Sequence, residues 1–194
     1  MKMREALITR TTKETDITLS INLDDGSKVS VDTGIGFFDH MLTAFAVHSG
    51  IGLEVKCKGD LNVDCHHTIE DVGIVLGQAF LEAIGDRAGI ARYGNFMLPM
   101  DEALALSAID ISGRAFLVFD AAFTAPMIGD FDTQMFEEFW RAFAMNAKVT
   151  LHIRLLSGAN DHHKAEAIFK AAAHAIKRAI AVNGSEVLST KGCL

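Results

Sequence analysis

Hydrophobic and polar residues alternate in several short segments of the N-terminal half. In residues 16–24, Ile17, Leu19, Ile21 and Leu23 occupy every second position, which is the period of a half-buried β-strand. Other segments place apolar residues three and four positions apart, the period of an amphipathic helix. The pattern predicts strands over residues 4–12, 16–24, 29–31 and 53–57 and helices over residues 37–48 and 67–84.

The same order of elements returns in the C-terminal half. Residues 39–59 align with residues 137–157, and a His-His pair follows both runs. Strands are expected over residues 95–100, 102–111, 114–123 and 149–156, and helices over residues 133–147 and 162–182. Such a repeat indicates a duplicated unit. We predict an α+β fold: a duplicated βββαβα unit with two four-stranded mixed sheets and helices packed between them, folded as a single domain from halves of about residues 1–90 and 91–194.

Composition narrows the classes of partner. The 194 residues carry a net charge of −7, and no basic stripe suits a nucleic acid. No apolar run is long enough for a membrane span. Cys57, Cys65 and Cys193 lack CxxC spacing, which favours a reducing compartment over a disulfide framework. We therefore expect a cytoplasmic protein that binds neither nucleic acid nor membrane.

The strongest chemical signal is an HHxxE motif that occurs in both halves. One copy is His66-His67-x-x-Glu70 and the other is His162-His163-x-x-Glu166, each at the start of a predicted helix. A histidine and a glutamate three or four residues apart share a helix face, but adjacent histidines point about 100° apart. A single motif is explained equally well by surface or capping histidines, whereas two copies in register favour metal binding. We expect two metal sites, each assembled from both clusters and from other segments.

Other residues extend this hypothesis. His40 and Glu138 align in the repeat, on the helices that precede the two motifs, and both side chains can bind a metal. Asp64 and Asp161 precede the His-His pairs, where each can cap the helix or orient an imidazole. Imidazole and carboxylate ligands without thiolate favour Mn²⁺, Fe²⁺ or Zn²⁺ over softer metal ions.

Three further histidines are less informative. A structural role for His48 and His152 is as plausible as a role in the site, and mid-helix His174 is expected to be structural.

Several further runs are distributed over the whole chain: GFFDHML, DCHHTIED, YGNFMLPMDEAL, DISGRAFL, TLHIRLLSG, NDHHKAEAIFKA and STKG. Together these runs resemble the imidazoleglycerol-phosphate dehydratases of histidine biosynthesis. The resemblance implies a hydro-lyase that converts D-erythro-imidazoleglycerol phosphate to imidazoleacetol phosphate and water with two Mn²⁺ per active site. It also implies a homo-oligomer of 24 subunits with active sites formed between subunits.

The resemblance also assigns roles to individual positions. The implied metal ligands are His40, His66, His67, Glu70, Glu138, His162, His163 and Glu166, of which Glu138 departs from the histidine found in many members. Glu14 matches the acid/base residue. The implied phosphate-binding residues are Arg92, Arg114, Ser189, Thr190 and Lys191, a set whose arginine forks and lysine charge suit phosphate oxygens.

The expected mechanism starts from the imidazole ring, because the carbon that loses its proton has no adjacent carbonyl. Metal ions on the ring nitrogens would favour an imidazolate, which expels hydroxide to give a diazafulvene, and a base then removes the neighbouring proton. The residues expected to carry catalysis are Glu14, His40, His66, Glu70, His162 and Glu166. Two alternatives remain open: a dinuclear metallohydrolase and a non-enzymatic metal-storage or metal-sensing shell.

Overall fold

The computed structural model describes residues 3–191, so Cys193 and Gly192 of the STKG run lie outside the described residues. One order of elements occurs twice along the chain. The first half contains β1 (Glu5–Thr11), β2 (Thr15–Asn22), β3 (Val29–Asp32), α1 (Gly36–Ser49), β4 (Gly52–Gly59) and α2 (His66–Ile84). The second half contains β5 (Tyr93–Met100), β6 (Ala103–Asp110), β7 (Phe116–Asp120), β8 (Met127–Ile128), β9 (Phe131–Asp132), α3 (Met135–Ala147), β10 (Thr150–Ser157) and α4 (Asp161–Ala179).

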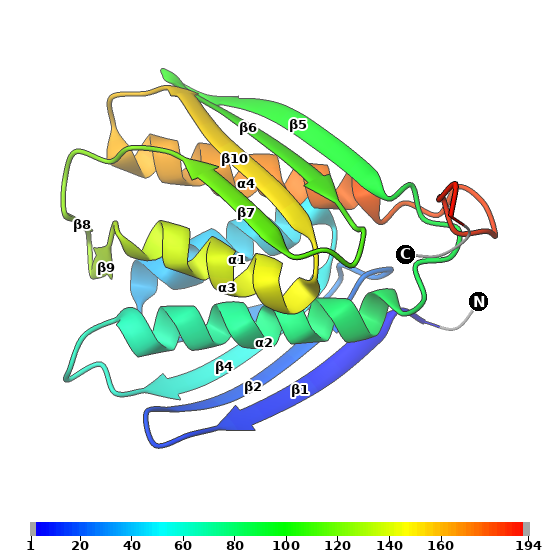
Figure 1. The fold of residues 1–194 in the computed structure, drawn as a ribbon. Helices are drawn as coiled ribbons and strands as arrows, with labels where there is room; N and C mark the ends of the chain where they lie inside the picture. The colour runs from blue at the N-terminus through cyan, green and yellow to red at the C-terminus, as the bar shows by residue number, and fades with distance from the viewer. Residues whose placement is uncertain (1–2, 192–194) are drawn as a thin grey trace.

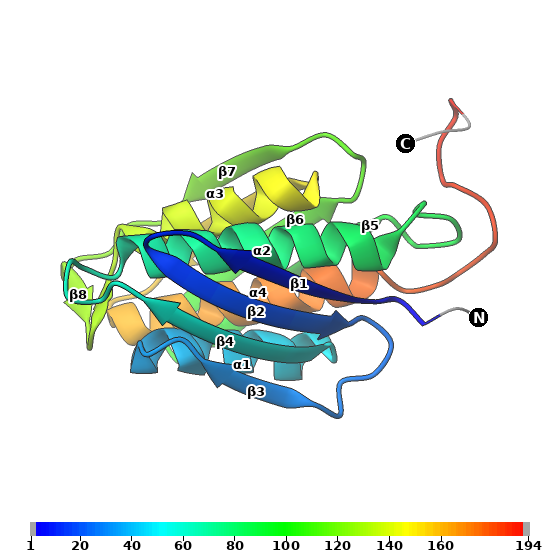
Figure 2. The same cartoon turned by 90° about the horizontal axis from the view of Figure 1, so that it is seen from below.

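The two halves form equivalent four-stranded sheets. Their strand orders are β1-β2-β4-β3 and β5-β6-β10-β7. In each sheet one pair is parallel, β3 with β4 or β7 with β10, and the other pairs are antiparallel. Helices α1, α2, α3 and α4 lie between the sheets, as Figures 1 and 2 show. This arrangement confirms the predicted fold class.

Alternation along the strands explains why each sheet has one covered face. In β2, Ile17, Leu19 and Ile21 are buried, whereas the residues between them are exposed or only partly buried. Strand β6 repeats this pattern with Ala103, Ala105 and Ser107 and with Ile109 at its end. Because the side-chain period of a strand is two, the apolar residues of both sheets face the helices. The buried residues form one hydrophobic cluster that includes both halves.

Close helix contacts connect the two halves. Helix α2 packs against α3, and α1 packs against α4, so each pair takes one helix from each half. A Cβ atom at Gly73 would lie 2.8 Å from the backbone oxygen of Phe139, and one at Gly77 would lie 2.7 Å from that of Phe143. Only glycine permits this approach. Within residues 3–191, no helix is both long and apolar enough to cross a lipid bilayer.

The short hairpin β8–β9 was absent from the predicted elements. Each of its strands has two residues, which is too short for an alternating pattern to be recognised. Asp130 in its turn accepts hydrogen bonds from the backbone N–H groups of Gly36 (3.0 Å) and Phe37 (3.3 Å). Because Ile35 offers no capping side chain, the first turn of α1 is capped by a residue from the other half.

Candidate functional site

A cluster of potential metal ligands lies where α1 meets the first turns of α4. His40 from α1 and His162 and Glu166 from α4 place their ligand atoms within 4.8 Å of one another. The Nε2 atoms of both histidines lie 3.0 Å from the same Glu166 oxygen, Oε1. Two imidazole nitrogens and a carboxylate oxygen suit a divalent transition metal. The donors present therefore fit such an ion.

The charge on Glu166 is stabilised from two sides. Its second oxygen, Oε2, forms an ion pair with Lys170, one turn farther along α4. Burial by itself would raise the pKa of Glu166, but the hydrogen bonds from Lys170, His40 and His162 outweigh it and lower the pKa to about 2. The side chain is 10% exposed and is ionised at neutral pH. It is therefore an anionic group at the centre of the cluster.

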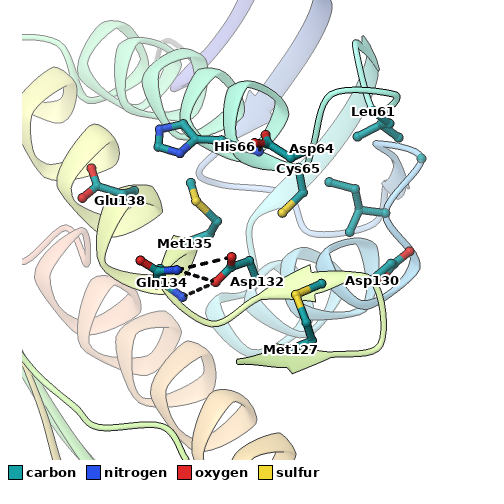
Figure 3. Close-up of a pocket in the computed structure, with 12 residues that line it drawn as sticks. Leu61, Asp64, Cys65, His66, Met127, Asp130, Asp132, Gln134, Met135 and Glu138 are labelled. Carbon is teal, nitrogen blue, oxygen red and sulfur yellow. Dashed lines mark hydrogen bonds between the residues drawn. The ribbon is translucent and has the colours of Figure 1, made fainter. Parts of the chain in front are cut away.

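The corresponding residues of the other helix pair are more open. On α2, His66 Nε2 lies 3.7 Å from Glu70 Oε2, and the Glu70 side chain is 43% exposed. His66 and Glu138 of α3 line the same cavity of about 630 Å³ (Figure 3). Within residues 3–191, ligand atoms from three residues come within 4.8 Å only in the His40 cluster. His66, Glu70 and Glu138 thus lie in one region, but their ligand atoms are not all within 4.8 Å of one another.

The second histidine of each motif points to different partners from the first. His67 has Nδ1 2.9 Å from Asp60 and Nε2 3.7 Å from Glu14. His163 has Nδ1 2.7 Å from Glu102 and Nε2 3.6 Å from Asp101. Neither belongs to the His40 cluster of its own chain. This division agrees with the 100° separation of adjacent helix positions.

Asp60 and Glu102 were not among the candidate residues identified from the sequence. The hydrogen bond that His67 donates to Asp60 raises the pKa of His67, and the one that His163 donates to Glu102 raises the pKa of His163. The backbone N–H of Asn160, followed by His163, lowers the pKa of Glu102 to about 2. Both acids lie in turns that border strands, a position where functional carboxylates are common. Sequence spacing did not indicate which turn approaches which histidine.

The acids that precede the His-His pairs differ in role. Asp64 lies one residue before the N-cap position of α2, which is Cys65, and it accepts a hydrogen bond from His66 N–H at 2.8 Å. At α4 the cap is Asn160, whose side chain accepts from the N–H groups of His162 and His163. Asp161 was expected to cap α4 or to orient an imidazole, but it does neither.

Asp161 instead connects α4 to the segment before β8. It accepts hydrogen bonds from Thr124 N–H, Thr124 Oγ1–H and Ala125 N–H, and it forms an ion pair with Lys164 at 2.7 Å. The expectation failed because the helix begins with Asn160 as its cap, which turns Asp161 inward to where it is 9% exposed.

The residues expected to bind phosphate line one open cavity of about 840 Å³. It includes Arg92, Arg114, Ser189, Thr190 and Lys191. The Arg92 guanidinium already donates to Asp110 and to the backbone oxygen of Leu188, so it anchors the C-terminal segment. Arg114 is 66% exposed, and its one ion pair within residues 3–191, with Asp110, is long at 3.4 Å. Arg114 is therefore the arginine with donors available to an anion.

The metal-ligand cluster and the basic cavity lie at opposite ends of helix α4. His162 and Glu166 are in the first turns of α4, whereas Arg92 N–H bonds to the backbone oxygen of Ala179, at the end of that helix. Helix α4 has 19 residues, so its ends are about 27 Å apart at 1.5 Å per residue. Figure 1 shows the C-terminal segment at the opposite end of the helices from β8 and β9.

His48, His152 and His174 and the two described cysteines are not part of the His40 cluster. His48 Nδ1 lies 3.4 Å from His174 Nε2, and the His174 ring stacks on Phe96. Burial is the main cause that lowers the pKa of both histidines. His152 is exposed on β10. Cys57 and Cys65 are free thiols.

Comparison with known proteins identifies the family. The family model of imidazoleglycerol-phosphate dehydratase matches residues 33–176. Curated relatives of that name include proteins of Streptococcus sanguinis, 55% identical over 194 residues, and Methanosarcina mazei, 57% identical over 192 residues; each alignment covers 99% of this chain and 100% of the relative.

Solved structures agree with the sequence comparison. The crystal structure of imidazoleglycerol-phosphate dehydratase from Staphylococcus aureus has a TM-score of 0.84 and 44% identity, covering 92% of this chain and 99% of that one. The Pyrococcus furiosus structure has a TM-score of 0.83 and 39% identity, covering 96% and 100%. The chain is thus an enzyme of the dehydratase class. It belongs to the imidazoleglycerol-phosphate dehydratase family, which confirms the resemblance drawn from its motifs.

Replacing the buried carboxylate of Asp161 should remove a pH-dependent contribution to stability. Burial alone would raise the Asp161 pKa, but Lys164 and the Thr124 and Ala125 groups lower it from 3.8 to about 2. A lowered pKa stabilises the folded state above the unfolded-state value, and this contribution is lost as pH falls from about 4 to about 2. At pH 7, Asp161→Asn should reduce the free energy of unfolding by roughly 2 kcal/mol.

Urea unfolding at fixed protein concentration checks this prediction. The difference from the parent protein should shrink as the pH is lowered through that window. Asp86→Asn, which removes an exposed turn carboxylate bonded to Ala88 N–H, is the matched control. Equal stability of the Asp161→Asn and parent proteins at pH 7 would contradict the assignment.

Proposed function

We propose that this dehydratase of histidine biosynthesis removes water from imidazoleglycerol phosphate with the help of two divalent cations per active site, giving imidazoleacetol phosphate. Its family membership establishes the class of reaction and a small phosphorylated substrate. Metal dependence rests chiefly on one observation, the convergence of His40 and His162 on a single oxygen of Glu166. Ion loading and the steps of the reaction belong to the proposal.

Two ligand sets would hold the cations. His40, His162 and Glu166 form one, and His66, Glu70 and Glu138 form the more open one. A bound divalent cation acts as a Lewis acid that lowers the pKa of the substrate's imidazole ring. Nitrogen and carboxylate donors suit Mn²⁺, and Fe²⁺ or Zn²⁺ can replace it. Glu138 supplies a carboxylate where His40 supplies an imidazole in the other half.

Glu14 is the proposed acid/base residue. It lies in the β1–β2 turn, is 53% exposed and faces His67 Nε2 at 3.7 Å. In the proposed sequence the anionic ring expels the hydroxyl group from the neighbouring carbon and gives a diazafulvene. Glu14 would protonate the departing hydroxyl or accept the carbon-bound proton. The resulting enol then tautomerises to the ketone.

The basic cavity would anchor the phosphate. Arg114 offers free guanidinium donors, and the segment with Ser189, Thr190 and Lys191 adds hydroxyl groups and a positive charge. Arg92 would act mainly by fixing this segment through Leu188. Anchoring the phosphate holds the reacting carbons at a fixed position relative to the acid/base residue.

A complete active site requires more than one copy of the chain. The substrate spans on the order of 10 Å, because its bonds are about 1.5 Å long. The metal cluster of one chain includes Glu166, and the basic cavity lies beyond Ala179 at the other end of α4, about 20 Å farther along the helix at 1.5 Å per residue. One substrate molecule cannot reach both. A homo-oligomer in which one copy supplies the cluster and another the phosphate pocket resolves this separation, and the 24-subunit assembly expected from the sequence is one such arrangement.

The two alternative functions are less well supported. A dinuclear metallohydrolase would use the same cluster to activate water, and a storage shell would need no basic cavity. Family membership argues against both, because the matched family consists of dehydratases.

Metal removal tests the Lewis-acid part of the proposal. Treatment with a chelator followed by desalting should reduce dehydration at least about 100-fold, and added Mn²⁺ should restore it, because the ring would otherwise stay neutral. Product formation should be measured together with the metal content of each sample. Full activity in a preparation shown by elemental analysis to be free of metal would refute the requirement.

The acid/base assignment predicts a specific kinetic defect. Glu14→Gln should lower kcat by about 100-fold or more with little change in substrate affinity, since the amide cannot exchange the proton. Steady-state kinetics and calorimetric titration with a substrate analogue measure the two effects. Glu5→Gln on β1 is the control, because it removes the same charge at a distance from the histidines. Near-parental kcat for Glu14→Gln would remove it from this role.

Mixed assemblies test whether two copies share each site. His162→Ala should inactivate the metal cluster and Arg114→Ala the phosphate pocket, so each variant alone should have little activity. Coexpression in equal amounts should recover about a quarter of parental activity, because random assembly pairs an intact cluster with an intact pocket in about one interface in four.

The control for this experiment is a mixture of the two separately purified variants without subunit exchange, which should stay inactive. A site contained within one chain predicts no recovery in either sample, and that result from coexpression would reject the shared site.

A further inference from the structure

The second histidine of each motif uses one ring nitrogen to contact a carboxylate of its own chain. His67 Nδ1 lies 2.9 Å from Asp60 Oδ2, and His163 Nδ1 lies 2.7 Å from Glu102 Oε2. An ionised carboxylate can only accept a hydrogen bond. In a neutral imidazole this contact places the proton on Nδ1 and leaves the Nε2 lone pair free.

The two halves reach this arrangement from positions that are not equivalent in the repeat. Asp60 directly follows β4 of the first half, whereas Glu102 directly precedes β6 of the second. Aligning β2 with β6, which have eight residues each, makes Glu14 the counterpart of Glu102. The same contact therefore does not simply follow from the duplication.

The equivalent positions Glu14 and Glu102 therefore have different surroundings in the two halves. In the second half, Glu102 is engaged by His163 and by the N–H groups of Ala159 and Asn160 at 3.1 and 2.7 Å. In the first half, Asp60 contacts His67 Nδ1, and the side chain of Glu14 stays exposed on the Nε2 side. Orientation of the imidazole by Asp60 thus leaves Glu14 available for proton transfer.

We propose that Asp60 and Glu102 are positioning residues that hold His67 and His163 as Nδ1–H tautomers and present Nε2 of each as a ligand to a divalent cation. Carboxylates that accept from the second nitrogen of a ligating histidine fix its orientation and increase its basicity. The inference rests on the proposed metal-dependent function. It assigns to Asp60 and Glu102 the orienting role that the sequence had suggested for Asp64 and Asp161.

Metal titration of the assembled protein tests the inference. After chelation and desalting, calorimetric titration with Mn²⁺ should show about 10- to 100-fold weaker binding for Asp60→Ala and for Glu102→Ala. Asp60→Asn should fall between the parent and Asp60→Ala, because its carbonyl oxygen still accepts from Nδ1–H. Asp25→Ala is the matched control: its carboxylate accepts from Ser27 N–H, and within the described part of the chain no hydrogen bond or ion pair joins it to a histidine. Parental affinity in both alanine variants would overturn the proposal.

A second readout does not depend on metal. Solid-state ¹⁵N NMR of histidine-labelled, metal-free protein should report Nδ1–H imidazoles for His67 and His163, and Asp60→Ala should change the signal of His67 alone. Because the Glu102 carboxylate also accepts from backbone N–H groups, its variant can lose folding, whereas the only hydrogen bond of the Asp60 carboxylate among the described residues is with His67. If the parent protein binds no Mn²⁺, the proposed function fails. If the parent binds Mn²⁺ but the tautomers are Nε2–H, only the positioning role fails.

Discussion

A single carboxylate oxygen, Oε1 of Glu166, has imidazoles from both halves of the chain within hydrogen-bond distance. His40 reaches it from α1 and His162 from α4, so the contact depends on the packing of these two helices. That packing in turn depends on two sheets whose apolar faces both turn inward. The negative charge at this position is stabilised by Lys170 on the side away from the histidines. The candidate site is thus a product of the internal duplication rather than of either half alone.

The two halves have diverged at the positions that set local charge. Lys170 neutralises Glu166 in the second half, whereas the corresponding position in the first half is Ile74, and Glu70 stays more exposed. His40 likewise corresponds to Glu138. One of the two proposed ligand sets is therefore rich in imidazole and paired with a lysine, and the other contains two carboxylates. Duplication supplied the geometry, and later substitutions made the two sets electrostatically different.

Most of the fold could be predicted from the sequence because it depends on local periodicity. Every strand of the two large sheets and all four helices follow from alternation or from three- and four-residue spacing, as β2 and α1 illustrate. The hairpin β8–β9 could not be predicted, since two residues carry no period. At the site, the motifs indicated the histidines, but not the contact of Asp60 with His67 or the separation of Arg114 from His162. Those relations depend on where turns lie in three dimensions.

The cap on α1 affects the order in which parts of the chain can fold during synthesis. The N–H groups of Gly36 and Phe37 are held by Asp130, which leaves the ribosome more than ninety residues later. Until Asp130 is synthesised, the helix that carries His40 has neither this cap nor its packing partner α4. The nascent N-terminal half therefore cannot assemble the cluster around His40, because His162 and Glu166 are synthesised after it.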